Sequence, residues 1–241
     1  MQVVRRSGFA LLGICLWISG AMVCPAAAKP PPEADTAFVE FRRMAVMPFF
    51  VGTRQPSFDE AGDKTLNCPI GELCAGMAEI DPGAGRVLTR MVYDALRLKF
   101  GDQVFSLESS RDAYAEAVVD ENAETPRLLA RKLGKGLKAD FVVVGTLWRY
   151  RDRGQVPGVS DSPASVAFAL YLVDTETGRR VWRGIFDESQ RPLTENLFKA
   201  RQSLKMGVKW LSAQELARFG VEQVMETFPP EEDLRKPMPA R

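Results

Sequence analysis

The stretch ADFVVVGTLWRYRDR (residues 139–153) decides the fold, because it holds the strongest strand signal in the chain. Residues 141–144 form an unbroken apolar run, which is typical of a buried strand. From Thr146 onward the run loosens into alternation, and charged residues end it. We therefore expect a strand here.

A β-hairpin is predicted directly afterwards, in SVAFALYLVDTETGRRVWRGIFDES (165–189). Its first arm carries apolar residues at alternate positions, and the other face of that arm is also largely apolar. Gly178 lies in the turn DTETGR (174–179), where it can supply a positive φ angle. The second arm alternates between two sets, which are Val181, Arg183 and Ile185 on one side and Trp182, Gly184 and Phe186 on the other.

The residues before the central stretch predict a strand, a long loop and a helix. The apolar run Met44 to Val51 indicates a buried first strand. Residues 52–85 lack clear periodicity, and a loop of this length is uncommon unless it is functional, stapled or disordered. The segment 83–102 has apolar residues at helical spacing, and Gly101 can end that helix in a left-handed conformation.

One short strand and two helices are expected before the central stretch. QVFSL (103–107) predicts the strand. SSRDAYAEAVVDE (109–121) opens with serines suited to an N-cap. ETPRLLARKLGKGLKAD (124–140) places Pro126 in the first turn of a helix, where proline is tolerated.

The C-terminal third is predicted to be helical. PLTENLFKARQSLK (192–205) and WLSAQELARFGVEQVMETF (210–228) form two helical segments. In the second segment Ser212 and Glu215 have the spacing of a capping box. The tail 229–241 is rich in proline and charge, so we expect it to be disordered.

The order of these elements defines the fold class. Early strands joined through helices are expected to be parallel, whereas strands joined by a hairpin are antiparallel. We therefore predict an α/β two-layer sandwich, with a mixed sheet that has an early parallel part and a later antiparallel hairpin, and with helices packed on it. Residues 41–228 are expected to form this single domain.

The first 28 residues have the pattern of a secretory signal peptide. Arg5 and Arg6 precede an uncharged apolar run, and small residues at 26–28 follow it. KPPPEADTAFVE (29–40) is then a Pro-rich tether. The predicted location is the periplasm, and nothing beyond the leader has the pattern of a transmembrane helix.

Two alternatives to cleavage concern the membrane. The apolar run of the leader is short for a retained anchor, since a bilayer span needs about 20 residues. Lipidation of Cys24 is disfavoured, because Val23 and Ala21 match the lipoprotein pattern poorly. An outer-membrane lipoprotein is thus the less favoured location, although peripheral or lipid-anchored association stays open.

The composition excludes several classes of function. The chain has no histidine, which is the usual general acid–base near neutral pH and the commonest metal ligand. Histidine-dependent hydrolysis and most zinc sites are therefore excluded, whereas carboxylate-only mechanisms are not. The net charge of +1 provides no basic surplus for nucleic acid. We expect no cofactor.

Cys68 and Cys74 are the only cysteines beyond the leader. Two cysteines without histidine cannot complete a zinc site, and their spacing is wider than the C-x-x-C redox motif. In an oxidising periplasm we expect them to form a structural disulfide that staples part of the 52–85 loop. Thiol exchange, free thiols or a metal remain alternatives.

Two polar segments are candidates for a site. RDRGQVPGVSDSPAS (151–165) links two strands, and binding residues concentrate in such loops. FDESQRPLTENLF (186–198) is the richest polar cluster, but its carboxylates also fit a strand end followed by a helix N-terminus. The candidate partner-binding residues are Arg151, Arg153, Gln155, Asp187, Glu188, Gln190 and Glu195.

Three short motifs in order resemble a family of bacterial envelope proteins. They are VMPF (46–49), ADFVVVG (139–145) and DTETGRRVW (174–182). The resemblance, over about 42–228, is to the α/β domain shared by the curli-secretion protein, LpoB and, in shape, the TolB amino-terminal domain. It implies a non-enzymatic domain that binds partners or assembles envelope machinery. The poor lipobox departs from the family, and the absence of long alternating hairpins argues against a secretion pore.

We therefore predict a non-catalytic periplasmic protein-binding domain in cell-envelope assembly or maintenance. Its partner would be an envelope protein, with a second copy of the chain included. One alternative is a carboxylate-dependent hydrolase or small-ligand binder that uses Asp187, Glu188 and Glu195. Another alternative is a structural subunit of an envelope oligomer.

Overall fold

A computed structural model describes residues 43–56, 63–120, 123–155, 162–190 and 211–235. The predicted signal peptide, the tether, the helix 192–205 and Glu195 lie outside these residues. Within the described ranges, no helix combines the length and apolar character needed to cross a bilayer.

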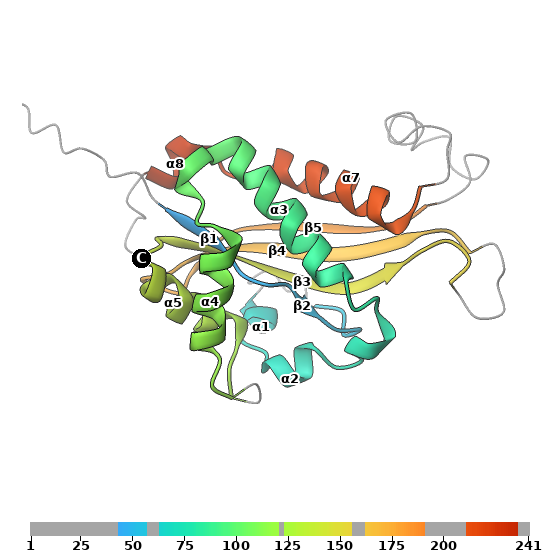
Figure 1. Cartoon of the computed structure of the whole chain (residues 1–241), viewed down its shortest axis with the longest axis horizontal. Coiled ribbons are helices and arrows are strands. Elements are labelled where there is room, and N and C mark those ends of the chain that lie inside the picture. Colours follow the sequence, from blue (N-terminus) through green and yellow to red (C-terminus); the bar gives the residue numbers. More distant parts are fainter. Residues whose placement is uncertain (1–42, 57–62, 121–122, 156–161, 191–210, 236–241) are drawn as a thin grey trace, which may run out of the picture. The chain divides into compact units, whose positions relative to one another are not determined.

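A five-stranded mixed sheet forms the centre of the fold (Figure 1). β3 (Phe141–Arg151) pairs in parallel with β1 (Met44–Val46) and β2 (Phe50–Val51) along one edge. On its other side β3 pairs antiparallel with β4 (Ser165–Asp174), which pairs antiparallel with β5 (Arg180–Ser189). The predicted α/β class and the mixed sheet with its hairpin are confirmed.

The predicted first strand is divided into β1 and β2. Val46 lies opposite Val143 and Phe50 lies opposite Thr146, so four steps along the chain match three steps on β3. The extra residue is accommodated around Pro48, which has no N–H to donate to a ladder. Both pieces stay on the same edge of β3 because the Met47 N–H still donates to the Val143 carbonyl at 3.0 Å.

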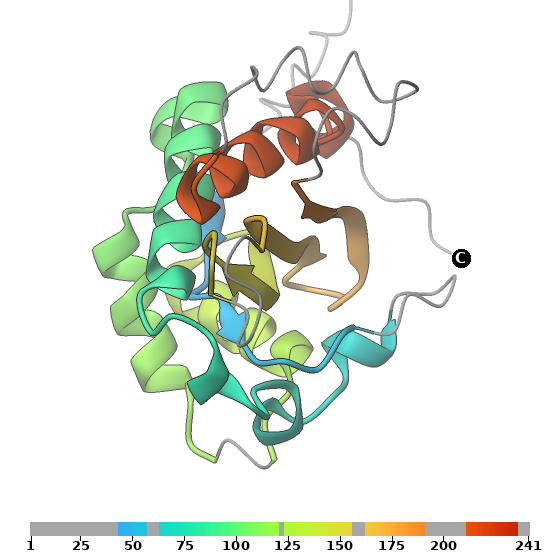
Figure 2. The same cartoon turned by 90° about the vertical axis from the view of Figure 1, so that its right-hand side faces the viewer.

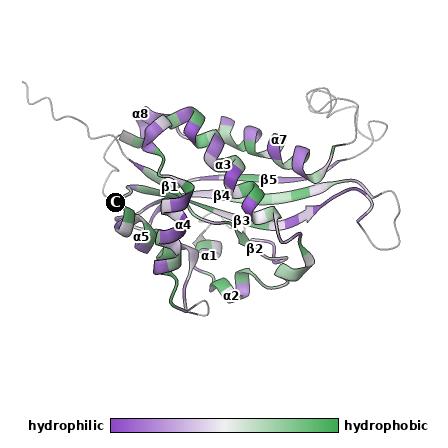
Figure 3. Cartoon of the chain, in the orientation of Figure 1, coloured by the Kyte–Doolittle hydropathy of each residue, from purple (hydrophilic) through white to green (hydrophobic). Residues whose placement is uncertain are grey.

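Helices cover both faces of the sheet, so the predicted two layers are corrected to three. α3 (Ala84–Phe100) and α7 (Ala213–Glu226) pack on one face, which we call face 1, together with Leu234 of α8 (Glu231–Arg235). α4 (Leu107–Ala117) and α5 (Pro126–Leu137) pack on face 2. The physical reason is β4, whose ten residues are all buried, so that both of its faces need a cover. Figures 2 and 3 show the helices around the sheet and their polar outward sides.

The segment predicted as a long loop contains short helices. α1 (Asp63–Leu66), α2 (Ile70–Leu73) and a 3₁₀ turn at Met77–Glu79 lie within it. Leu66, Ile70 and Leu73 are buried in the face 2 cluster. These helices are too short to show a helical period in the sequence, so the pattern could not predict them.

Two further expectations are corrected. QVFSL forms no strand, because only Val104 bridges to Met44 and α4 already begins at Leu107. The Ser106 hydroxyl caps that helix by accepting the Ser109 N–H at 3.1 Å. Part of the tail expected to be disordered is α8, which is held by buried Leu234.

The predicted helix boundaries at the other positions are confirmed. Gly101 ends α3 at the predicted place with a φ angle of 58°, although its ψ angle of −131° is not that of the left-handed helical cap that was expected, and Pro126 lies in the first turn of α5. Ser212 and Glu215 form the capping box that begins α7. Gly178 has a φ angle of 71° in the β4–β5 turn, as the hairpin prediction requires.

Candidate functional site

The sheet brings the two predicted polar segments together at one end. Arg151 pairs with Ser165, and Ser165 pairs with Ser189, so the end of β3, the start of β4 and the end of β5 lie side by side. We call this region the polar end; it comprises the exposed or half-buried residues Arg149, Arg151, Asp152, Arg153, Gln155, Asp187, Glu188, Ser189 and Gln190, with buried Ser165 between them. All predicted partner-binding residues except Glu195, which lies outside the described residues, are located here.

A β-bulge in β3 determines which side chains face each other at the polar end. Leu147 pairs with Phe168, but Arg149 rather than Trp148 pairs with the next β4 residue, Ala167. Trp148 is thus the extra residue, and the shift turns Arg149 from the apolar face 1 to face 2. Asp187 also pairs with Ala167, from the β5 side, so the guanidinium and the carboxylate lie on the same face.

Arg149 holds a small polar network that the sequence did not reveal. Its Nη2 forms an ion pair with Asp187, and its Nε donates to the Ser165 hydroxyl at 2.5 Å. The hydroxyls of Ser165 and Ser189 are 2.7 Å apart. One side chain therefore joins all three strands at their ends. Strict strand alternation predicts the opposite face for Arg149, so only the bulge could have identified it.

The loop after β3 is fixed to the start of α7. The Asp152 Oδ1 accepts the Arg153 N–H at 2.9 Å and the Ala213 N–H at 3.2 Å. The Gln155 Oε1 accepts the Asp152 N–H at 2.9 Å, so this amide supports the loop internally. Arg151 and Arg153 are exposed on this anchored backbone. Both arginines are thus presented to solvent from a position that the fold fixes.

Gln190 and Glu188 differ from the exposed arginines. The Gln190 Oε1 accepts the Leu211 N–H at 2.8 Å, and its own N–H donates to the Ala164 carbonyl at 2.9 Å. Gln190 therefore ties the end of β5 to the residues before α7. Glu188 is half-buried and pairs with Val166, which belongs to the face 1 cluster. Both side chains are turned away from the face that carries Arg149 and Asp187.

The candidate carboxylates Asp187 and Glu188 do not converge on a reaction centre. Asp187 and Glu188 are neighbours on a strand, so their side chains lie on opposite faces of the sheet. The Asp187 carboxylate is also paired with Arg149. General acid–base hydrolysis needs two carboxyl groups that face one substrate, and this pair cannot meet that requirement. Among the described residues, no group of three or more Cys, Asp or Glu side chains is close enough to hold a metal ion.

Cys68 and Cys74 flank α2 and are half-buried against the face 2 cluster. No disulfide joins them in the structure, so the predicted staple stays a prediction. The Cys68 Sγ lies 3.7 Å from the Glu72 Oε2 and 3.7 Å from the Arg54 Nη1, and these two groups form an ion pair at 2.5 Å. Burial raises the pKa of the Cys68 thiol, which favours the protonated form and disfavours thiolate chemistry.

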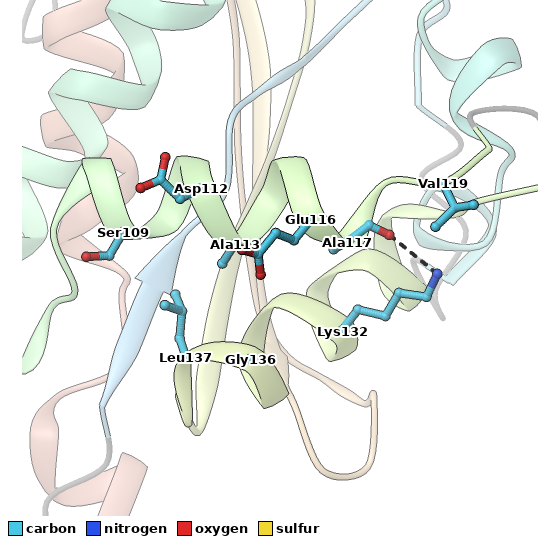
Figure 4. A pocket seen from close by; sticks show the side chains of 9 residues that line it. All are labelled: Ser109, Asp112, Ala113, Glu116, Ala117, Val119, Lys132, Gly136 and Leu137. Carbon is cyan, nitrogen blue, oxygen red and sulfur yellow. Dashed lines mark hydrogen bonds between the residues drawn. The ribbon is translucent and has the colours of Figure 1, made fainter.

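A groove of about 600 Å³ lies between α4 and α5 (Figure 4). Its rim carries Asp112 and Glu116 from α4, and exposed Val119 lies at one end. The Lys132 Nζ donates to the Ala117 carbonyl at 3.4 Å and is paired with buried Glu124. The Lys132 amine therefore provides a hydrogen-bond donor for a backbone carbonyl at the C-terminal end of α4. The two potential nucleophiles in the lining are engaged elsewhere, because the Ser109 hydroxyl lies 2.9 Å from the Ser106 hydroxyl and Lys132 is paired with Glu124, so we do not assign the groove a site.

No family model and no curated protein matches the chain. Three solved structures show a distant likeness. The PelC dodecamer from Paraburkholderia phytofirmans matches at 13% identity and a TM-score of 0.42, over 76% of this chain and 85% of that chain. The LpoB C-terminal domain from Escherichia coli matches at 14% and 0.36, over 62% and 84%. Lipoprotein GNA1162 from Neisseria meningitidis matches at 14% and 0.37, over 78% and 99%.

LpoB thus occurs both among these structures and in the envelope family that the sequence motifs resemble. A likeness at these TM-scores and identities carries no conclusion about activity or partners. The function proposed below therefore rests on the polar end and on the sequence.

Proposed function

We propose that this chain is a non-catalytic, periplasmic protein-binding domain that acts in cell-envelope assembly or maintenance. The observation that carries the proposal is the anchored display of Arg151 and Arg153 at the polar end. Asp152 ties their loop to α7, so the backbone that carries the two exposed arginines is fixed in place. Exposed, backbone-anchored loop residues are the usual carriers of recognition.

The charges at the polar end define the partner's chemistry. Arginine presents several N–H donors in a planar fork that matches carboxylates, and it is enriched at protein interfaces. We therefore expect carboxylates on the facing surface of the partner, opposite Arg151 and Arg153. The polar end is mixed in charge, because it contains the acidic residue Asp187 as well as the two arginines. A surface of mixed charge favours a folded protein over a polyanion as the partner.

The hydrolase alternative named Asp187, Glu188 and Glu195, of which Glu195 lies outside the described residues. Asp187 and Glu188 point to opposite faces, and Asp187 is paired with Arg149, so these two do not support catalysis. The periplasmic location is supported by the leader pattern of residues 1–28. It is consistent with a role outside the cytoplasm, where an envelope protein is the available partner.

Site-specific photo-crosslinking in the producing cell tests the proposal. A photoreactive amino acid at Arg153 is expected to give a discrete crosslinked product, and Arg151→Glu should reduce that product. The matched control carries the same amino acid at Leu98, which is 91% exposed near the end of α3, and should give none. Identical products from both positions, or no product from Arg153, would refute a partner at the polar end.

A further inference from the structure

β5 is an edge strand whose two faces differ. Within the described ranges it pairs only with β4, and its ten residues include no lysine or proline to protect the outer edge. Face 1 of β5 is packed under α7, where a Cβ added to Gly184 would lie 2.3 Å from the Val224 Cγ1. On face 2, Ile185 is 38% exposed. An apolar side chain therefore lies at solvent in the middle of an edge strand.

The charges on face 2 of β5 are arranged symmetrically around Ile185. Arg183 lies two residues before it and Asp187 two residues after it. The register places all three on the same face, because they pair with Tyr171, Ala169 and Ala167 of the face 2 cluster. Charges on an edge strand usually prevent pairing with another strand, but this arrangement is self-complementary when the second strand runs in the opposite direction.

We propose that β5 pairs antiparallel with β5 of a second copy of this chain, about a two-fold axis through Ile185. In such a pair, residues equally far before and after the central residue face each other. Arg183 of each copy then lies opposite Asp187 of the other, whose carboxylate is also paired with Arg149 of its own copy, and the two Ile185 side chains meet. The backbone groups on the outer edges hydrogen-bond, so the sheet continues from one copy into the other.

The pairing register distinguishes the proposed dimer from nonspecific association of exposed edge strands. With the axis at Gly184, Arg183 would face Ile185; with the axis at Phe186, Ile185 would face Asp187. Either shift places an apolar side chain opposite a charge. Only the axis at Ile185 both pairs opposite charges and places the two isoleucines together. We do not expect an unrelated strand to carry the same pattern. This surface is distinct from the exposed arginines of the proposed function and shares only Asp187 with the polar end.

The first test is the mass of the protein in solution. The protein is produced from its full coding sequence and purified in the form that the cell produces after any processing. Its mass is then measured by light scattering across a concentration series. We expect twice the monomer mass, and Ile185→Lys should return it to the monomer mass. Val119→Lys is the matched control, because Val119 is also an exposed apolar residue, at 82%, but lies beside α4, and it should remain dimeric. A monomeric wild-type protein, or a dimeric Ile185→Lys variant, overturns the proposal.

The second test uses charge reversal and mixing. Arg183→Asp and Asp187→Arg each place like charges opposite each other twice, so each variant should dimerise about tenfold more weakly or worse. Mixed together, the two variants should form a heterodimer, because both opposite-charge pairs are restored. Circular dichroism checks that each variant is folded. Absence of the heterodimer between folded variants overturns the register. Crosslinking from Arg153 that persists in Ile185→Lys would show that the partner site stands independently of the dimer.

Discussion

β4 and β5 are neighbouring strands of ten residues each, but they have different roles. Every residue of β4 is buried, and its side chains alternate between the two apolar clusters. In β5, only Gly184 and Phe186 are buried, both on the side of α7, whereas face 2 carries Arg183, Ile185 and Asp187. Packing on both faces therefore accounts for the residues of β4. It accounts for only half of those of β5, and the other half is where we infer recognition.

This difference separates residues that determine stability from residues that determine association. A destabilising substitution in β4 should lower the free energy of unfolding, and it should not change the association of the protein as long as the chain is folded. A change on face 2 of β5 should do the reverse. The predictions below test this separation, from the largest expected effect to the smallest.

Phe168→Ala should cause the largest loss of stability. The ring is fully buried on β4 and packs against Phe49 and Phe186, with ring centroids 6.4 Å and 5.5 Å away. Deleting a buried phenylalanine ring costs about 3–5 kcal/mol. Ile185→Ala on β5 is the matched change and should cost less than about 1 kcal/mol, since the side chain is exposed. Urea unfolding measures both values, and equal losses would contradict the comparison.

Gly184→Ala tests the packed face of β5. The added Cβ would lie 2.3 Å from the Val224 Cγ1 and 2.7 Å from the Trp182 ring, so α7 must shift. Overpacking of this kind costs about 1–3 kcal/mol in the free energy of unfolding. Gly136→Ala is the control, because no atom lies within 4 Å of its added Cβ in α5. That helical substitution should stabilise the protein by up to about 1 kcal/mol. A neutral Gly184→Ala would contradict the close approach of α7.

The predicted Cys68–Cys74 disulfide concerns the segment under face 2. If it forms after export, closing this short loop should stabilise the protein by up to about 2 kcal/mol, and dithiothreitol should remove the gain. Cys68→Ala/Cys74→Ala is the control and should not respond to the reductant. Thiol titration of the exported protein in denaturant decides the question, because two titratable thiols would refute the disulfide.

Tyr150 should make stability fall at alkaline pH. Burial first, and then the charges of Asp81 and Asp152, raise its pKa to about 12. The phenol ionises near pH 10 in the unfolded chain, so the folded state binds more protons between pH 10 and 12. The contribution to stability is therefore complete below about pH 10 and is lost as the pH rises to about 12. Tyr150→Phe should flatten that part of a pH series of urea unfolding curves, and an unchanged slope would contradict the assigned pKa.

The long elements of this fold were predictable from sequence, and the reasons are local. β3, β4 and the helix 84–100 each repeat their pattern over ten or more residues. α1 and α2 span four residues each, which is too short for a period, so they were missed. QVFSL has the composition of a strand, but a hydroxyl cap at Ser106 starts a helix within it. Here the local cap prevailed over β propensity.

The candidate site was predictable in place but not in detail. Polar segments at strand ends were found from composition, and the hairpin register brought them together. Arg149 was missed because a bulge has no signature in this stretch, and strict alternation puts that residue on the other face. Gln155 and Gln190 were chosen for their polarity, whereas their amides accept backbone N–H groups within the fold. Tertiary hydrogen bonds of this kind cannot be inferred from residue type alone.

The bulge at Trp148 makes the polar end depend on the pairing register of β3 and β4 as well as on its chemistry. If the two strands paired without the bulge, Trp148 would lie opposite Ala167 and Arg149 would turn toward Val166 in the apolar face 1 cluster. The guanidinium would then leave Asp187 and lie against the apolar residues of face 1, on the same side as Glu188, which pairs with Val166. In homologous chains of the same length whose strands pair without this bulge, the combination of Arg149 with Asp187 should therefore be absent.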